Sequence, residues 1–126
     1  MKRIIFAGLL LAGSMAATAQ DVMEDGSMVV LPVEAQQCSL PSAPPPISEV
    51  PEKAELLAAQ KKIKQFQVDM EAYRTCIDKD ADNPDLSAGE ERAISNAHNY
   101  SVDMEERVAN MFNEGIRAYK ANQAKK

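Results

Sequence analysis

Residues 56–77 read LLAAQKKIKQFQVDMEAYRTCI, and this stretch decides the fold class. Its apolar residues recur in alternating steps of three and four, which places them on one face of an α-helix. A stripe with this spacing is far more typical of a packed core than of a ligand site. The residues of this helix seam are Leu56, Ala59, Ile63, Phe66, Met70, Tyr73 and Ile77.

The pattern predicts a helix over about residues 51–79. Pro51 suits the first turn, where its missing amide proton costs nothing, and Glu52 and Glu55 suit the positive end of the helix dipole. The acidic run 78–85, which contains Pro84, ends the helix.

A second helix is predicted over about residues 88–122. Ser87 and Glu90 form an S-x-x-E capping box at its start. Both long elements are predicted to be helices, which indicates an all-α fold. The connection between them is short, which predicts that they form an antiparallel two-helix hairpin. The second seam is weaker and comprises Ile94, Ala97, Ser101, Met104, Val108, Met111 and Gly115.

The charged residues offer a prediction of the register between the two helices. A symmetric turn midway between them would place a basic cluster opposite an acidic one. The pairs expected are Lys61 with Glu106, Lys62 with Glu105 and Lys64 with Asp103.

Residues 1–19 are typical of a secretory signal peptide. Lys2 and Arg3 form a positive start, an apolar run follows over 4–11, and Ala17-Thr18-Ala19 is a peptidase site. The apolar run is shorter than the roughly 20 residues that a bilayer-spanning helix needs. We expect a mature chain that starts near Gln20 and is periplasmic or secreted, with no membrane insertion after leader removal.

The mature chain is acidic. Removing Lys2 and Arg3 from the 14 basic residues leaves 12 against 19 acidic residues, a net charge of −7. This balance argues against nucleic acid and anionic lipid surfaces as partners, because both attract cationic proteins. The length allows one small domain with a thin core.

The two cysteines, Cys38 and Cys76, both lie in the part predicted to be exported. An even count in an oxidising compartment indicates one structural disulfide, and two free or intermolecular thiols remain the alternative. The cysteines do not form a Cys-x-x-Cys pair, which gives a redox enzyme little support.

Residues 20–50 are expected to form a largely irregular arm, acidic at first and then proline-rich. The apolar patch 29–33 could be an edge strand, and the stretch 40–46 should be extended polyproline II, most often a spacer. The extended arm from Cys38 to Pro51 and the helix from Pro51 to Cys76 would each span about 40 Å. We therefore expect the arm to run back along the hairpin and to be joined to it near the turn. A disulfide there would stabilise the fold by roughly 3 to 4 kcal/mol.

Catalytic motifs are missing from the sequence. The single histidine, His98, lies in a polar stretch and is expected to be a solvated helix residue. No serine has a nucleophile-elbow context, and no glycine-rich phosphate loop is present. The protein is predicted not to be an enzyme, with no catalytic residues and no cofactor.

The turn between the helices suggests one alternative, a weak calcium site. Asp78, Asp80 and Asp82 alternate like the first ligands of a calcium loop, and Glu90 could supply the bidentate carboxylate. Glu90 lies one position too far along the chain for the usual loop. A solvated acidic turn is the competing interpretation.

The segment 70–78, with Tyr73-x-x-Cys76-Ile77, resembles a loose group of uncharacterised small exported bacterial proteins. These proteins pair a cysteine after the leader with such a segment and a later helix, and Phe112-Asn113 and Tyr119-Lys120 are similar to that helix. The resemblance covers about residues 38–122. It implies the disulfide and the hairpin, and it implies no activity.

The sequence thus favours a non-catalytic periplasmic or secreted helical protein with an interaction or structural role. A protein partner or self-association is expected, since the seam is richer than two helices alone can cover. Methionine side chains adapt well to varied partners. Those on the predicted contact surfaces are Met23, Met28, Met70, Met104 and Met111.

Overall fold

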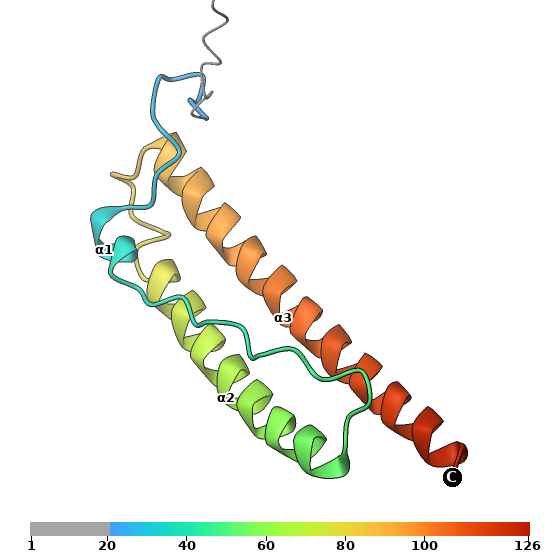
Figure 1. Ribbon diagram of the computed structural model, residues 1–126. Coiled ribbons are helices and arrows are strands. Elements are labelled where there is room, and N and C mark those ends of the chain that lie inside the picture. Colours follow the sequence, from blue (N-terminus) through green and yellow to red (C-terminus); the bar gives the residue numbers. More distant parts are fainter. Residues whose placement is uncertain (1–20) are drawn as a thin grey trace, which may run out of the picture.

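The computed structural model describes residues 21–126, so the predicted leader, residues 1–19, lies outside the described residues. Three helices follow one another along the chain: α1 (Val33–Gln36), α2 (Lys53–Asp78) and α3 (Ala88–Ala124). The two long helices lie side by side and run in opposite directions (Figure 1). The predicted antiparallel hairpin is confirmed.

The core lies between α2 and α3. Met70 and Ile77 are completely enclosed, and Phe66 is only 4 % exposed. From α3, Ile94 and Val108 are buried, while Met104 and Met111 pack partly buried against the core. The remaining buried seam residues of α2 are Leu56, Ile63 and Tyr73.

Local sequence defines where the long helices begin. Ser87 caps α3 through its hydroxyl, which accepts from the backbone amide of Glu90, and the Glu90 carboxylate accepts from the amide of Ser87. The predicted capping box is confirmed. Helix α2 has Glu52 at its N-cap without a side-chain cap, directly after the buried Pro51.

The two helices are offset at the turn. The Asp78 carboxylate, at the end of α2, lies beside the His98 ring, whereas α3 already begins at Ala88. Helix α3 therefore projects about 15 Å past the end of α2, at 1.5 Å per residue. In the connection, successive turns are closed by the amides of Ala81 and Asn83, and the chain runs along the projecting part of α3 (Figure 1).

This offset makes the predicted charge register wrong. Glu105 pairs with Arg74 instead of Lys62. The only other close contact between a basic and an acidic side chain among residues 21–126 is that of His98 with Asp78, so neither Lys61 nor Lys64 meets its predicted partner. The prediction assumed a symmetric turn, and the real connection advances α3 relative to α2.

The projecting part of α3 is covered by the N-terminal loop, which we define as residues 21–31. A short hairpin-like turn brings Val22 opposite Met28, with Gly26 at a φ of +84°, the left-handed conformation that glycine tolerates best. The Ser27 hydroxyl accepts from the amide of Gly89 in the first turn of α3. A side chain at Gly89 would collide with the carbonyl of Met28, so only glycine allows this close approach.

The chain then forms α1 and passes into the proline-rich segment, which we define as residues 39–51. Helix α1 was not predicted, and its Ala35 joins the core. Beyond Cys38 the segment runs extended along the two long helices to the start of α2 (Figure 1). The predicted proline-rich arm along the hairpin is confirmed.

Candidate functional site

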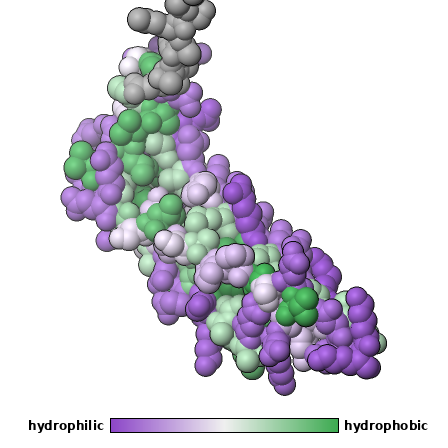
Figure 2. All heavy atoms as spheres, viewed as in Figure 1, coloured by the Kyte–Doolittle hydropathy of each residue, from purple (hydrophilic) through white to green (hydrophobic). Residues whose placement is uncertain are grey.

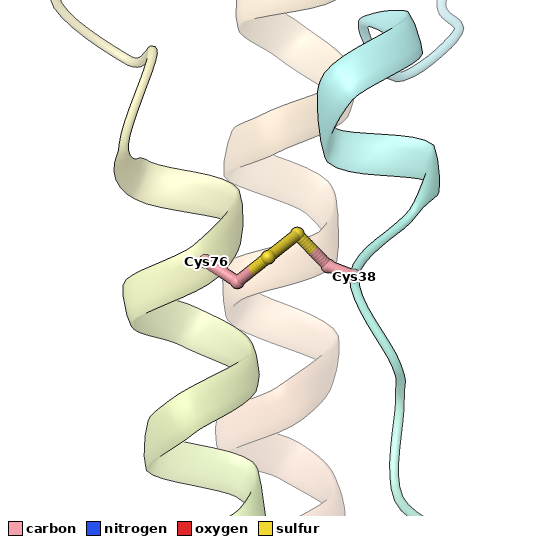
Figure 3. The surroundings of a disulfide bond; sticks show 2 residues. All are labelled: Cys38 and Cys76. Atoms are coloured by element: carbon pink, nitrogen blue, oxygen red, sulfur yellow. A yellow bond between two sulfur atoms is a disulfide. The ribbon is translucent and has the colours of Figure 1, made fainter.

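The disulfide joins Cys38, directly before the proline-rich segment, to Cys76, in the last turns of α2 (Figure 3). The two Cα atoms are 5.8 Å apart, within the usual range for a disulfide. Thirty-eight positions separate the two cysteines in sequence, and both are half-buried. The predicted Cys38–Cys76 bond is confirmed.

Two shallow hollows border Cys76. One lies towards the proline-rich segment and is lined by Ser39, Pro41, Asp69, Ala72 and Tyr73. Burial raises the pKa of the Tyr73 phenol there. The other lies along the outer side of α2 and is lined by Val68, Glu71, Ala72, Thr75 and Lys79. The disulfide is thus bordered by open surface on both sides.

The far end of the proline-rich segment is attached by side chains. Ile47 fills the space above Gly115 of α3, where an added Cβ would lie 2.9 Å from the Ile47 Cδ1 atom. The Glu55 carboxylate accepts from the Ser48 amide at 2.9 Å and from the Ser48 hydroxyl at 2.6 Å. The hydrogen bond from the Ser48 hydroxyl lowers the pKa of Glu55 from its ordinary value, and the bond from the Ser48 amide adds a smaller effect in the same direction.

A polar contact crosses between the long helices. Arg74 donates through Nη1 to the Ser101 hydroxyl and through Nη2 to the Glu105 carboxylate. Ser101 is completely buried and donates its own proton to the carbonyl of His98 at 2.6 Å. The Ser101 hydroxyl therefore both accepts a hydrogen bond from Arg74 and donates one to the His98 carbonyl. This is a structural arrangement and not that of a nucleophile beside a side-chain base.

His98 lies at the surface of α3. Its side chain is 43 % exposed, and its Nδ1 atom is 3.5 Å from the Asp78 carboxylate. This is a longer contact than a good hydrogen bond, and it links the end of α2 to α3. The arrangement fits a solvated helix residue.

The four predicted calcium ligands, Asp78, Asp80, Asp82 and Glu90, do not come together. Within residues 21–126 no three His, Cys, Asp or Glu side chains are placed to share a metal ion. The Glu90 carboxylate caps α3, and the Asp78 carboxylate lies beside His98. The described residues therefore hold no ready-made calcium site in this turn, and calcium binding stays a prediction.

The N-terminal region carries an apolar and acidic surface, which we call the N-terminal face. Four of its apolar side chains are exposed, namely Val22, Met28, Val30 and Val33. Figure 2 shows apolar atoms gathered over this part of the molecule and hydrophilic atoms along both flanks. From residue 21 to 52 the chain has no lysine or arginine, and its acidic residues are Asp21, Glu24, Asp25, Glu34, Glu49 and Glu52.

The N-terminal face is held in place by its contact with α3. The Asp25 carboxylate accepts from both the hydroxyl and the amide of Ser27. Both bonds lower the pKa of Asp25 from its ordinary value, and the bond from the hydroxyl has the larger effect. Ser27 in turn accepts from Gly89. One short chain of hydrogen bonds thus orders the loop on the helix.

Several of these residues escaped the sequence-based reasoning. The pairs Ile47 with Gly115 and Met28 with Gly89 join positions far apart in sequence. Gly115 was predicted as a seam residue, but nothing in the sequence links it to Ile47 or links Gly89 to Met28. Helix α1 had a usable signal, Pro32 directly before its first residue. The contact of Ser48 with Glu55 had none, because it spans an unusual seven positions.

Comparison of the chain with known protein families, with curated proteins and with solved structures found no match. Of the helices in residues 21–126, none is both long and apolar enough to cross a membrane.

Proposed function

We propose that this is a non-catalytic exported protein that acts by binding another protein through its N-terminal face. The observation that carries the proposal is the exposure of neighbouring apolar side chains there, with Val33 at 68 % and Val30 at 48 %. Apolar side chains grouped on a surface and rimmed by polar residues are a common property of protein-binding sites.

The charge of the N-terminal face indicates which kind of protein would bind there. The part of the chain that forms the N-terminal face carries exposed carboxylates, among them Asp21, Glu24 and Glu34, and no lysine or arginine. A partner that is apolar at its centre and basic at its edge would match it. Charge complementarity of this kind speeds association and excludes wrong partners.

The order of the N-terminal loop also favours binding. Ser27 and Met28 fix the loop on Gly89, so its exposed apolar side chains are held in place before any partner arrives. A surface ordered in advance loses less conformational entropy on binding than a flexible one.

Site-specific photo-crosslinking in living cells tests the proposal. A photoreactive residue replaces Val30 or Val33, and the matched control replaces Val68, an equally apolar residue that is 61 % exposed on α2. We expect a discrete protein adduct from Val30 and Val33 and none from Val68. Absence of adducts from both N-terminal positions would contradict the proposal, as would the same adducts from all three.

The charge component is tested separately. The variant Glu24→Gln/Glu34→Gln removes two carboxylates without touching the apolar side chains. We expect a weaker adduct from Val30 and a weaker dependence of the adduct on salt. An unchanged yield at low and high salt would restrict the interaction to the apolar side chains.

Export is part of the proposal, supported by the leader-like residues 1–19 and by the Cys38–Cys76 disulfide. The mass of the protein recovered from the periplasm or the medium should correspond to a chain that starts at Gln20 and has no free thiol. The variant Ala19→Arg should block cleavage. A full-length chain in the cytoplasm would contradict export.

A further inference from the structure

The proline-rich segment is attached to the hairpin in a way that differs from the rest of the fold. No residue from 39 to 51 takes part in a backbone–backbone hydrogen bond of the described chain. One end is held by the Cys38–Cys76 disulfide and the other by the Ser48–Glu55 contact. Between these ends only side-chain packing holds it.

The segment covers apolar surface of both long helices. Pro44 to Ile47 line a hollow together with Ala58 and Ala59 of α2. Pro46 to Glu49 border Met111, Gly115 and Ala118 of α3. Its removal would open a groove along the hairpin, lined by these small and apolar side chains and by the charged residues Glu55, Lys62 and Glu114.

The surroundings of the disulfide are partly open. Both cysteines are half-buried, and Cys76 borders open hollows on two sides. Thiol–disulfide exchange requires that a thiolate reach one of the sulfur atoms, and an enclosed bond would prevent this.

The hairpin has contacts that do not depend on the disulfide. The buried residues Phe66, Met70 and Val108 pack between the helices, and Arg74 links them through Glu105. These contacts would remain after the segment leaves.

We propose that the Cys38–Cys76 disulfide is a redox switch that controls whether the proline-rich segment covers the groove between α2 and α3. In the oxidised protein the segment is closed over the groove. In the reduced protein the segment detaches at Cys38, while the hairpin stays folded and the groove is open.

The switching reaction is an exchange with a dithiol. A thiolate of the dithiol attacks one sulfur atom of the disulfide, which gives a mixed disulfide and releases the other cysteine as a thiolate. The second thiol of the reductant then displaces the remaining cysteine. The protein gains two electrons and two protons as Cys38 and Cys76 become thiols, and the dithiol becomes a disulfide.

Methyl NMR of the full mature chain, oxidised and after reduction with dithiothreitol, tests the switch. In the oxidised protein the Ile47 δ1 methyl should show NOEs to Gly115 and Leu56, which surround the same space. After reduction we expect these NOEs to disappear and the Ile47 signal to sharpen. The core methyl signals of Ile63 and Val108 and the helical circular dichroism should remain.

Two results would overturn the switch. Persistence of the Ile47 NOEs after reduction would mean that packing alone keeps the segment closed. Collapse of the Ile63 and Val108 signals, with loss of helix, would mean that the disulfide is simply required for folding.

Two variants distinguish the effect of the Cys38–Cys76 disulfide from that of the Ser48–Glu55 contact. Cys38→Ser/Cys76→Ser should reproduce the reduced spectrum without any reductant, and an oxidised-like spectrum would refute the proposal. Glu55→Gln in the oxidised protein weakens only the far attachment, so the Ile47 NOEs should persist there. Their loss would assign control to Glu55 and not to the disulfide.

Discussion

The guanidinium group of Arg74 on α2 reaches the carboxylate of Glu105 on α3, with Nη2 and Oε1 3.0 Å apart. The two side chains are 19 % and 26 % exposed, so water screens the pair less than it would at an open surface. The same arginine donates to the completely buried Ser101. This pair connects the helices at a register that differs from the one expected for a symmetric turn.

Replacing Arg74 should destabilise the hairpin. Arg74→Ala removes a charged donor from both Ser101 and Glu105, and we expect the free energy of unfolding to fall by about 1 to 2 kcal/mol. Glu105→Gln keeps an acceptor and should cost only about 0.5 kcal/mol. Urea denaturation followed by circular dichroism measures both, with Lys61→Ala as the exposed control. Equal losses for Lys61→Ala and Arg74→Ala would contradict the role of this pair.

Replacing Gly89 should detach the N-terminal loop from α3. In Gly89→Ala the new methyl group would occupy the place of the Met28 carbonyl, so the loop must move away while the helix itself tolerates alanine well. The amides of Met23 and Val29, which donate to Ser27 and Asp21, should then exchange faster with solvent. Ser95→Ala, at an exposed position of α3, should leave their exchange unchanged. Full protection in Gly89→Ala would show that the contact is dispensable.

Replacing Gly115 should displace Ile47. Gly115→Leu fills the space that Ile47 occupies, and overpacking of this kind costs about 1 to 3 kcal/mol. Gly115→Ala requires only a small shift of a flexible side chain, and its better helix propensity, up to about 1 kcal/mol, opposes that cost. Thermal denaturation should rank wild type and Gly115→Ala close together and Gly115→Leu below both. Ala121→Leu, at an exposed position, is the control for size alone.

Acid should loosen the far end of the proline-rich segment. The pKa of Glu55 is lowered in the folded protein, so its contact contributes stability above the ordinary glutamate range and loses it as pH falls through the lowered value. Ser48→Ala removes the main cause, and an NMR titration should then show the pKa of Glu55 moving up towards its ordinary value. An unchanged titration of Glu55 in Ser48→Ala would contradict the assignment.

The oxidised protein should be a monomer. The proline-rich segment covers the groove between α2 and α3, along which a second hairpin would otherwise pack to complete a four-helix bundle (Figure 1). Light scattering coupled to size exclusion should give the mass of one mature chain across a wide range of concentration. A concentration-independent dimer would show that another face of the hairpin is used for self-association.

The hairpin was predictable because local patterns specify it. The seam from Leu56 to Ile77 has a period that only a helix satisfies, and Ser87 with Glu90 marks the start of the next helix. The disulfide and the course of the proline-rich segment followed from an even cysteine count and from two matching lengths.

The register and the N-terminal loop were not predictable, because they depend on contacts between distant residues. The offset of α3 is stabilised where Met28 meets Gly89 and where Arg74 meets Glu105, and periodicity within one helix says nothing about such pairs. The acidic turn between the helices shows the same dependence on contacts between distant residues. Spacing along the chain does not determine whether side chains such as Asp80 and Glu90 converge.

The absence of lysine and arginine from residues 21–52 has a consequence for proteolysis. Trypsin-like proteases cut after basic residues, so in the chain from Asp21 onward their first site is Lys53, in the first turn of α2. They therefore cannot sever the N-terminal loop or the proline-rich segment internally, even when either is detached from the helices. Under oxidising conditions this whole region will be released as one fragment, still joined through Cys38 to the peptide that contains Cys76.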